Sequence, residues 1–400
     1  MNVEELIRDT FREQAEDDPR TPPGFADRVL AVRRRRRART IAGAALATVA
    51  AIAVTVGVPR LDGGGQDVRP AGPVDRSADI VARPDQYPPR DMVAAGGTVL
   101  AAFSVQSLVK QPDKDEVLTR TYQRLDRKTG RYVKDTRWSV IDTAPSSRTA
   151  AVLERTLPAR RVGLLDLTTG EIRRWIPVPQ GVAGVALSPD GRKIVATTYS
   201  SDPDRRYWSH RIETSGPDGE KGWMLKGVAC RTGFSIIDVA SGRTEWHRAP
   251  DWKDEWGRSQ GGRWDFRFSA DSTLLYEHIV TQPHRQYHDL SGRSVATPVN
   301  ERKFELDLAG YSPDKKFLVH PSGVRDMTTG KDVPKVSDYM ALLAWADNKR
   351  LIVFENSRHG DHPHRLALLT LGSSKVVPLT AYGPQMMNEM GSWEPLFSAR

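Results

Sequence analysis

The sequence has very little cysteine: Cys230 is the single thiol among 400 residues. One thiol cannot form an intrachain disulfide, which excludes the class of small exported domains that disulfides hold together. The fold must therefore depend on a large buried core, and the length allows one large domain or two ordinary ones. A buried, unreactive thiol is the favoured interpretation of Cys230, with pairing to another chain as the alternative.

The sequence also lacks the common motifs of catalytic and cofactor sites. It has no G-x-S-x-G elbow, P-loop, H-E-x-x-H or C-x-x-C. Its many aspartates lie in patterns that turn chemistry explains. We therefore predict no catalytic residue and no cofactor for this chain.

One short stretch offers metal-ligating side chains, residues 359–364 (HGDHPH). The candidate ligands are His359, Asp361, His362 and His364, three imidazoles and one carboxylate of the types that bind Zn²⁺. Gly360 and Pro363 mark the same stretch as a hairpin loop between two strands, where histidines are simply solvated. The loop interpretation is favoured, and metal binding is the alternative.

One long apolar run without charged residues is present, Ile41–Val58. Its eighteen residues would rise about 27 Å as a helix, close to the hydrocarbon thickness of a bilayer. The positive-inside rule places the preceding arginines, and so the N-terminus, in the cytoplasm. These arginines are Arg33, Arg34, Arg35, Arg36, Arg37 and Arg39. We predict one membrane-spanning helix, with a cleaved export signal and a buried soluble helix as alternatives.

The formal net charge of +9 is distributed unevenly. Residues 1–27 hold three arginines against eight carboxylates, and residues 28–39 hold seven arginines and no acid. The remainder therefore carries +7, because −5 and +7 and +7 sum to the total of +9. Topology explains the arginine run, and a mildly basic outer part is not a nucleic-acid signature. We predict no nucleic-acid partner.

The acidic N-terminal segment has one apolar face. Leu6, Ile7 and Phe11 follow at helical spacing and would lie together on a short amphipathic helix. Acidic residues disfavour the negatively charged inner leaflet and favour a groove on a cytoplasmic protein partner. The alternative is a poorly ordered tail without a partner.

These features divide the chain into four parts. We predict a cytoplasmic segment at 1–39, a transmembrane helix at 40–58, a flexible Gly- and Pro-rich linker at 59–82 and a folded domain at 83–400. The protein would then be a single-pass protein of the cell membrane with an extracytoplasmic C-terminal domain.

Two turn patterns alternate along the folded part with a period of about 40 residues. The first runs from an aspartate to a glycine, and its copies end at Gly130, Gly170, Gly242, Gly292 and Gly330; a worn copy without the aspartate ends at Gly372. The second is a Ser-Pro-Asp-Gly type of turn before an apolar strand, and its copies begin at Pro145, Ser188, Ser269, Ser312 and Ala346. The alternation predicts an all-β propeller with six four-stranded blades. Seven blades, with a terminal strand near Trp393 closing the ring, and an open sandwich are the alternatives.

These turns resemble the TolB-type, WD40-like propeller repeat, whose mark is the S-P-D-G turn before a strand. The resemblance covers roughly residues 90–380, and the copies at Ser188 and Ser312 keep the Ser-Pro-Asp core. The overall layout is similar to actinobacterial single-pass proteins with an external propeller, some of which resemble membrane-bound anti-sigma factors. This resemblance implies a sigma factor as a cytoplasmic partner, although the zinc-binding His and Cys motif of one anti-sigma class is absent here.

A long insertion interrupts one repeat at 200–233, and a second Trp-rich stretch follows at 246–264. Exposed tryptophan beside arginine is typical of interaction surfaces. The candidate ligand-binding residues are Arg205, Arg206, Tyr207, Trp208, Trp223, Trp252 and Trp256. The alternative is that these aromatic side chains fill the core between blades.

Two hypotheses of function follow from these features. The favoured one is a non-enzymatic, membrane-anchored binding or signalling protein whose outer propeller recognises a protein or an envelope ligand and whose inner segment binds a cytoplasmic regulator. The alternative is an exported hydrolase or lyase that uses the propeller and is anchored by its N-terminal helix.

Overall fold

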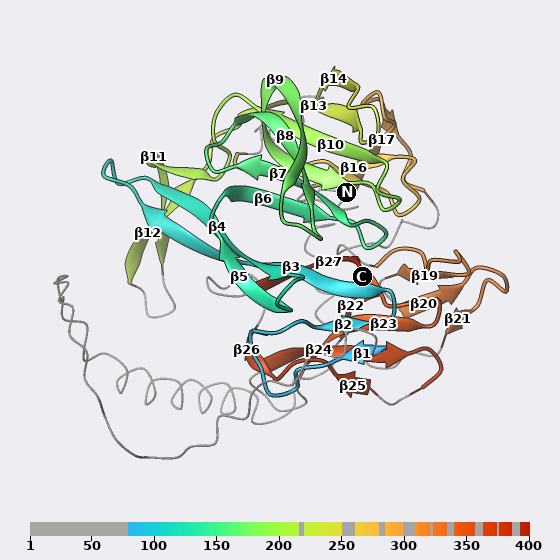
Figure 1. The fold of residues 1–400 in the computed structure, drawn as a ribbon. Helices are drawn as coiled ribbons and strands as arrows, with labels where there is room; N and C mark the ends of the chain where they lie inside the picture. Colours follow the sequence, from blue (N-terminus) through green and yellow to red (C-terminus); the bar gives the residue numbers. More distant parts are fainter. Residues whose placement is uncertain are drawn as a thin grey trace, which may run out of the picture. The chain divides into compact units, whose positions relative to one another are not determined.

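Every regular element in the described part of the chain is a β-strand, which confirms the predicted all-β class (Figure 1). The computed structural model describes residues 79–215, 220–249, 261–279, 285–298, 309–320, 323–333, 340–356, 363–373, 376–385 and 393–400. The chain divides into two units, Met1–Pro70 and Ala71–Arg400, and all described residues belong to the second. Within these residues, no helix has the length and apolar character needed to cross a bilayer.

The predictions for 1–39 and 40–58 lie outside the described residues, as does most of the predicted linker. The last linker residues are described, and they are folded rather than flexible. Ile80–Val81 form β1, which pairs with Ala94–Ala95. Val81 is buried, so two adjacent β-branched residues already contribute to the core at this point.

The first sheet contains both the first and the last strands of the described chain. Its members are β1 (Ile80–Val81), β2 (Ala94–Ala95), β3 (Thr98–Lys110), β4 (Glu116–Asp126), β5 (Arg131–Asp135), β11 (Arg205–Ser215), β12 (Lys221–Lys226) and β27 (Trp393–Ala399). Strand β27 pairs antiparallel with β3, in a register that runs from Trp393 opposite Val105 to Ala399 opposite Thr98. The predicted strand near Trp393 therefore exists and joins the two ends of the domain.

The second sheet has seven strands, in the order β14-β13-β10-β9-β8-β7-β6. They are β6 (Trp138–Thr143), β7 (Thr149–Glu154), β8 (Ala159–Asp166), β9 (Ile172–Leu187), β10 (Lys193–Tyr199), β13 (Arg231–Asp238) and β14 (Thr244–Arg248). Strand β9 is shared, because Ile172–Pro177 pairs with β8 and Val182–Leu187 with β10. The sheet therefore consists of two antiparallel halves that meet at β9.

Three smaller antiparallel sheets follow. The four-stranded sheet has β15 (Arg267–Phe268), β16 (Leu275–His278), β17 (Arg285–His288) and β18 (Ser294–Val295). The three-stranded sheet has β19 (Phe317–His320), β20 (Gly323–Asp326) and β21 (Asp332–Val333). The five-stranded sheet has β22 (Met340–Trp345), β23 (Arg350–Asn356), β24 (Pro363–Thr370), β25 (Val376–Pro378) and β26 (Gly383–Gln385).

The five Asp-to-Gly patterns and the worn copy at Gly372 form the turns that the sequence predicts, each between two paired strands. The turn between β8 and β9 illustrates the chemistry. The Asp166 carboxylate accepts a hydrogen bond from the Thr168 backbone N–H at 2.7 Å. Gly170 then adopts a φ of +77°, which a side chain would strain. The aspartate and the glycine therefore have structural roles at these positions.

The Ser-Pro-Asp pattern is also confirmed as a turn before a strand. The Ser188 hydroxyl donates to the Asp190 carboxylate at 2.5 Å and accepts from the Lys193 N–H, which begins β10. Gly191 has a φ of +71° in this copy, and Lys315 has +60° at the equivalent place of another. The turn geometry is thus retained where the glycine is lost, with a strained non-glycine residue in its place.

Apolar clusters connect each of the larger sheets to a neighbour in the chain. Tyr122 of the first sheet packs with Val152 and Leu165 of the second, and Phe266, which precedes β15, packs with Val195 of β10. Val319 packs with Trp345 near the C-terminal end. Leu100, Phe103 and Trp393 then pack with Ile352 and Leu366, so the last sheet also contacts the first. Strands such as β7, β10 and β23 are buried on both faces as a result.

Candidate functional site

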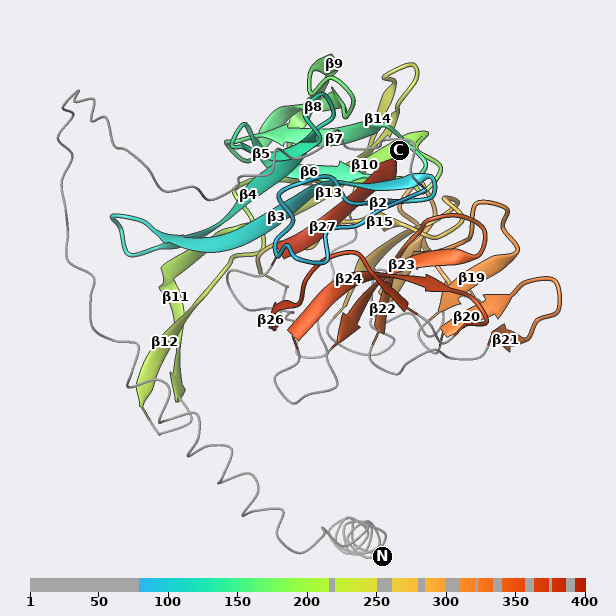
Figure 2. The same ribbon diagram turned by 60° about the horizontal axis from the view of Figure 1, so that its bottom comes forward.

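The predicted insertion forms a hairpin that extends the first sheet. β10 and β13 pair directly, with Tyr199 opposite Arg231, so the residues between them are an insertion into that pair. Its strands β11 and β12 pair with each other, and Arg205 and Arg206 of β11 pair with Val117 and Glu116 of β4. Figure 2 shows these strands extending away from the remaining sheets together with the ends of β3 and β4. We use the name arm for β11 and β12 together with residues 106–120, which comprise the end of β3, the turn after it and the start of β4.

An arginine lies between two tryptophans on the arm. The Arg211 guanidinium carbon is 4.4 Å from the centre of the Trp208 ring and 4.7 Å from that of Trp223. Arg211 Nη1 donates to the Trp208 carbonyl at 2.9 Å, and Lys114 Nζ lies 5.5 Å from the same indole. Such cation–π stacking orders a long side chain and keeps the aromatic faces beside a positive charge.

Exposed apolar side chains are concentrated on the arm. Seven large apolar residues are exposed in the described part of the chain: Val109, Val133, Ile212, Trp223, Met224, Trp246 and Tyr382. Four of them belong to the arm, and Trp223 has the largest exposed fraction, 52%. The alternative prediction of core packing is therefore wrong for Trp223, whereas Trp208 and Tyr207 are half-buried.

Ion pairs fix the start of β11 against the turn between β3 and β4. Arg205 Nε donates to Asp115 at 2.7 Å, and its other end pairs with Asp113. The Trp208 backbone N–H donates to the second Asp115 oxygen at 2.8 Å. These hydrogen bonds from Trp208 and Arg205 lower the pKa of Asp115. Arg205 thus has a structural partner rather than a free guanidinium.

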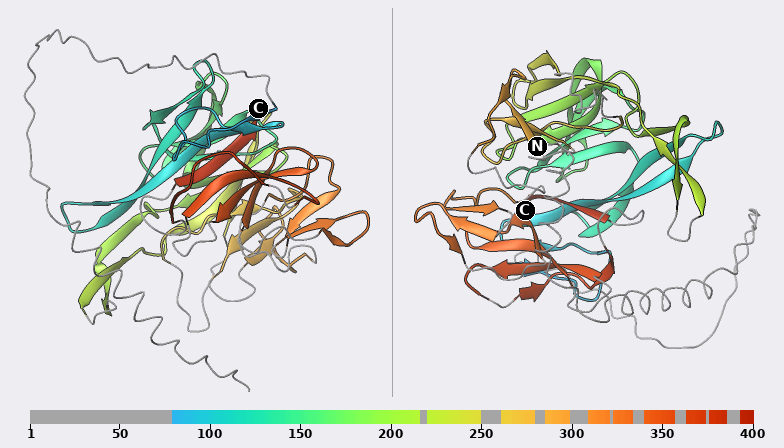
Figure 3. Two further views of the ribbon diagram at one scale, coloured as in Figure 1. Left: turned by 90° about the horizontal axis from the view of Figure 1, so that it is seen from below. Right: turned by 180° about the vertical axis from the view of Figure 1, so that it is seen from behind.

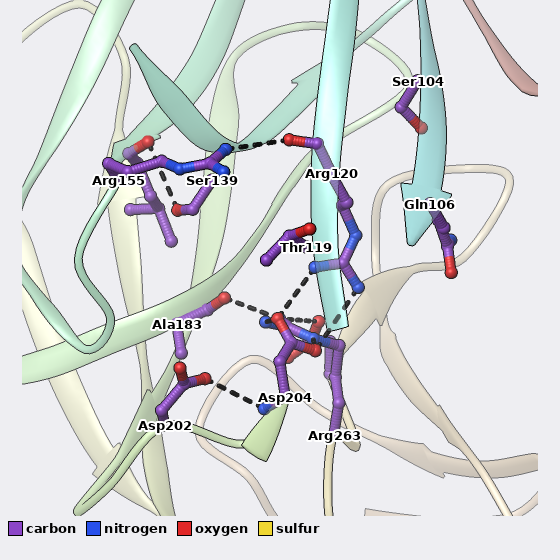
Figure 4. Close-up of polar contacts among 12 residues, drawn as sticks. Ser104, Gln106, Thr119, Arg120, Ser139, Arg155, Ala183, Asp202, Asp204 and Arg263 are labelled. Atoms are coloured by element: carbon purple, nitrogen blue, oxygen red, sulfur yellow. Dashed lines mark hydrogen bonds and ion pairs between the residues drawn. The ribbon is translucent and has the colours of Figure 1, made fainter. Parts of the chain in front are cut away.

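A buried cluster of charges lies at the root of the arm, immediately before β11 (Figure 4). The Asp204 carboxylate accepts from Arg263 at 2.6 and 2.8 Å and from Arg120 at 2.8 Å. Asp204 is 5% exposed. Burial by itself would raise the pKa of Asp204, but the Arg263 and Arg120 guanidinium groups lower it to about 2. The carboxylate is therefore charged under ordinary conditions and holds two cations.

The cluster continues into the neighbouring sheets. Arg263 Nη1 donates to the Ala183 carbonyl of β9 at 2.6 Å and to Asp265 at 2.9 Å. The Tyr199 hydroxyl of β10 donates to Asp265 at 2.7 Å. Burial, followed by the nearby Asp265 charge, raises the pKa of Tyr199 well above its usual range. The root of the arm is thus bonded to the second sheet and to the approach to β15.

Asp202, two residues before Asp204, has the opposite electrostatic environment. Its carboxylate accepts the Asp204 backbone N–H at 2.9 Å, and no ion pair links it to a cation of the described residues. Burial, and then the negative charge of Asp204, raise its pKa. The nearby thiol of Cys230 is buried, as predicted, and burial raises its pKa.

Of the four candidate metal ligands, the structure describes only His364. His359, Asp361 and His362 lie outside the described residues, in the connection between β23 and β24. His364 lies within β24 and is fully buried, so the prediction of a solvated histidine is wrong for this residue. Its Nε2 is 3.1 Å from the Tyr87 hydroxyl, and burial lowers the pKa of His364 to about 4. Within the described ranges, no three His, Cys, Asp or Glu side chains form a metal-binding group.

The second Trp-rich stretch, residues 246–264, is described only in part. Trp252 and Trp256 lie outside the described residues, whereas Trp246 on β14 is 39% exposed and donates from its indole to Thr198. Arg120, Asp204 and Arg263 are not among the site residues predicted from the sequence. Their roles depend on contacts between residues 84 and 59 positions apart, which no local pattern indicates.

Comparison with known proteins gives a distant likeness of structure. No protein-family model matches the sequence, and no curated protein matches it. TolB from Acinetobacter baumannii matches 74% of this chain with 16% identity and a TM-score of 0.36. An acylaminoacyl peptidase in complex with Z-Gly-Gly-Phe-chloromethyl ketone matches 72% with 11% identity and a TM-score of 0.35. Dihydro-heme d1 dehydrogenase NirN in complex with DHE matches 71% with 14% identity and a TM-score of 0.24.

The matches span 66% of the TolB chain, 45% of the peptidase chain and 74% of the NirN chain. At these identities and TM-scores, the likeness assigns no activity, ligand or partner to this chain.

Proposed function

We propose that this chain is a non-enzymatic, membrane-anchored binding protein built on a six-bladed β-propeller. Apart from β1, β2, β11, β12 and β26, the strands divide by their pairings into six groups: β27-β3-β4-β5, β6-β7-β8 with the first half of β9, the second half of β9 with β10-β13-β14, β15 to β18, β19 to β21 with the Tyr311 bridge, and β22 to β25. The pairing of β27 with β3 and the packing of Trp393 against Leu366 support closure of these groups into a ring.

The sequence supports the anchor and the topology. Ile41–Val58 would cross the membrane, the arginines before it would remain in the cytoplasm, and the propeller would lie outside. The apolar face of Leu6, Ile7 and Phe11 would bind a cytoplasmic regulator such as a sigma factor.

The Trp208–Arg211–Trp223 stack, with Trp223 exposed, is the observation that favours binding as the function. Aromatic and arginine side chains dominate the energetics of many interfaces. Here they lie on a hairpin that leaves the sheet packing, with Trp223 more than half exposed. The ion pairs of Asp204 and Arg205 hold the hairpin in place, so little ordering entropy would be lost on binding.

The arm is tested by retention of the full-length protein on an envelope fraction of the source organism. We expect the double variant Trp208→Ala, Trp223→Ala to lose retention. Tyr382→Ala is the matched control, because Tyr382 is 41% exposed and has Arg365 stacked 4.3 Å from its ring. Equal retention of the wild type and both variants would refute recognition by the arm.

The inner segment is tested with residues 1–39 as bait in lysate. Specific capture of a regulator that is lost on alanine substitution of Leu6, Ile7 and Phe11 would support signalling. If the wild-type segment captures nothing more than the triple alanine variant, the function would have to lie entirely in the outer domain. Turnover of envelope glycans or peptides by the purified full-length chain would replace the binding proposal with the hydrolase or lyase alternative.

A further inference from the structure

The outermost strand of the arm has two adjacent exposed apolar side chains between two lysines. Strand β12 reads KGWMLK, from Lys221 to Lys226, and it is the last strand of its sheet among the described residues. Trp223 and Met224 are 52% and 43% exposed. The views in Figure 3 show β11 and β12 apart from the other sheets. No described strand pairs with the outer edge of β12.

Apolar surface is present on both faces of this hairpin. Side chains alternate along a strand, so Trp223 and Met224 point to opposite faces. Ile212, which is 42% exposed, lies directly opposite Met224, and Arg211 stacks on Trp223 on the other face. A protein partner docked on one face of the hairpin would leave the apolar side chains of the other face in water. A medium that surrounds the edge of β12 would cover the apolar side chains of both faces. A membrane interface is such a medium, and tryptophan is enriched there.

The charges of the arm complement an anionic surface. Glu213 pairs with Lys221 at 2.7 Å, and Arg205 pairs with both Asp113 and Asp115, so one of these two carboxylates is not neutralised. Glu116 and Glu220 have no cationic partner in the described part of the chain, which brings the negative charges to three. Five cationic side chains of the arm have no carboxylate partner among the described residues: Lys110, Lys114, Arg206, Arg211 and Lys226. These five positive charges exceed the three negative charges by two.

The position of the arm within reach of a membrane follows from the proposed anchor, on which this inference depends. Twenty residues, 59–78, separate the apolar run from the first described residue. A flexible linker of that length spans about 25 Å on average. The folded domain would then remain close to the bilayer, and even a weak affinity of β12 for lipid would keep it docked.

We propose that β12 docks on the anionic headgroup layer of the membrane that anchors the chain. Trp223 and Met224 enter the interface, and the Lys226 ammonium group lies at the level of the lipid phosphates, while Lys221 stays beside Glu213. The unpaired backbone edge of β12 remains hydrated at this depth. The arm therefore fixes which side of the domain faces the membrane.

The test places an environment-sensitive fluorophore at position 224 of the full-length protein by Met224→Cys. Reconstituted vesicles contain phosphatidylcholine with or without phosphatidylglycerol, and brominated lipids serve as quenchers. Val133→Cys on β5 is the matched control, because Val133 is 38% exposed outside the arm. The single native thiol, Cys230, is buried, and labelling of the unsubstituted protein measures its background.

We expect quenching at position 224 with phosphatidylglycerol and little at position 133. A cationic side chain beside an anionic membrane changes the docking equilibrium about fivefold, so Lys221→Ala with Lys226→Ala should weaken it roughly 25-fold. Equal, weak quenching at both positions would overturn the proposal. A shift in emission that depends on protein concentration, without quenching by lipid, would assign β12 to a second copy and overturn it too.

Flotation of the same vesicles after a carbonate wash tests the anchor separately. Protein that floats without quenching at position 224 refutes lipid docking alone. Protein that does not float but is still quenched refutes the anchor and supports lipid binding by β12. Absence of both signals refutes both proposals.

Discussion

Replacing Asp204 by Asn should destabilise the domain because it removes the one carboxylate that two largely buried arginines, Arg120 and Arg263, share. Asn has the same shape as protonated Asp, so the variant approximates the wild type with this group neutral. A pKa of about 2, against an ordinary 3.8, corresponds to about 2 kcal/mol. We therefore expect Asp204→Asn to lower the free energy of unfolding by about 2 kcal/mol at pH 7.

The pH dependence gives this prediction its sign. The folded state lowers the pKa of Asp204, so its stabilisation is complete above the unfolded pKa of 3.8 and is lost as the pH falls towards 2. The difference between wild type and Asp204→Asn should therefore shrink to about half near pH 3. Urea unfolding of the full-length chain in mild detergent, followed at pH 7 and pH 3, measures both values.

Asp202→Asn is the matched control with the opposite sign. Burial and the Asp204 charge raise the pKa of Asp202, so its ionisation opposes folding at pH 7. The Asn carbonyl can still accept the Asp204 backbone N–H. We expect Asp202→Asn to maintain or increase stability. Equal losses in the two variants, or a loss in Asp204→Asn that does not change with pH, would refute the electrostatic argument.

Three further predictions concern the rest of the domain. His364 is buried and its pKa is lowered to about 4, so the unfolded state takes up a proton before the folded state does as the pH falls. The wild type should therefore lose about 2 kcal/mol of unfolding free energy between pH 7 and pH 5, and His364→Phe should reduce that loss in thermal unfolding scans. Lys315→Gly should raise the unfolding free energy by about 1 kcal/mol in urea titrations, because Lys315 has a φ of +60° where another copy of the turn has glycine. Phe397→Ala should cost about 3 to 5 kcal/mol in the same titrations, because this β27 side chain is 6% exposed in the cluster that joins the first and last sheets. A flat pH response for the wild type, a destabilised Lys315→Gly or a neutral Phe397→Ala would contradict the respective argument.

The features that could be predicted from the sequence depend on local chemistry. A turn needs only its own few residues, so Asp166–Gly170 and Ser188–Gly191 could be placed between strands from the residue pattern alone. The insertion at 200–233 was identifiable because it interrupts this regular spacing, and it is a hairpin between the paired strands β10 and β13. Trp223 is exposed on that hairpin, and its part in an interaction surface stays a prediction.

The features that were missed depend on contacts distant in the sequence. His364 follows Gly- and Pro-rich residues that indicate a loop, yet Tyr87, 277 positions away, packs beside it and contributes to its burial. Asp204 occurs in the turn-like stretch Asp202–Arg205, and its two arginines come from β4 and from the approach to β15. Charged residues are common at such positions, so only the fold shows which of them form a buried cluster.

The Asp204 cluster is better explained by the orientation of the arm than by stability. Buried ion pairs contribute little net stability, because desolvation of the charges cancels much of their attraction. Their hydrogen bonds are directional, however, and Asp204 directly precedes the first residue of β11. Apolar packing would allow the hairpin to rotate about its root, whereas Arg263 and Arg120 fix the carboxylate from two directions. An arm that must present Trp223 and Met224 to one particular surface needs this directional support, and Asp204→Asn should therefore weaken binding by the arm in addition to lowering stability.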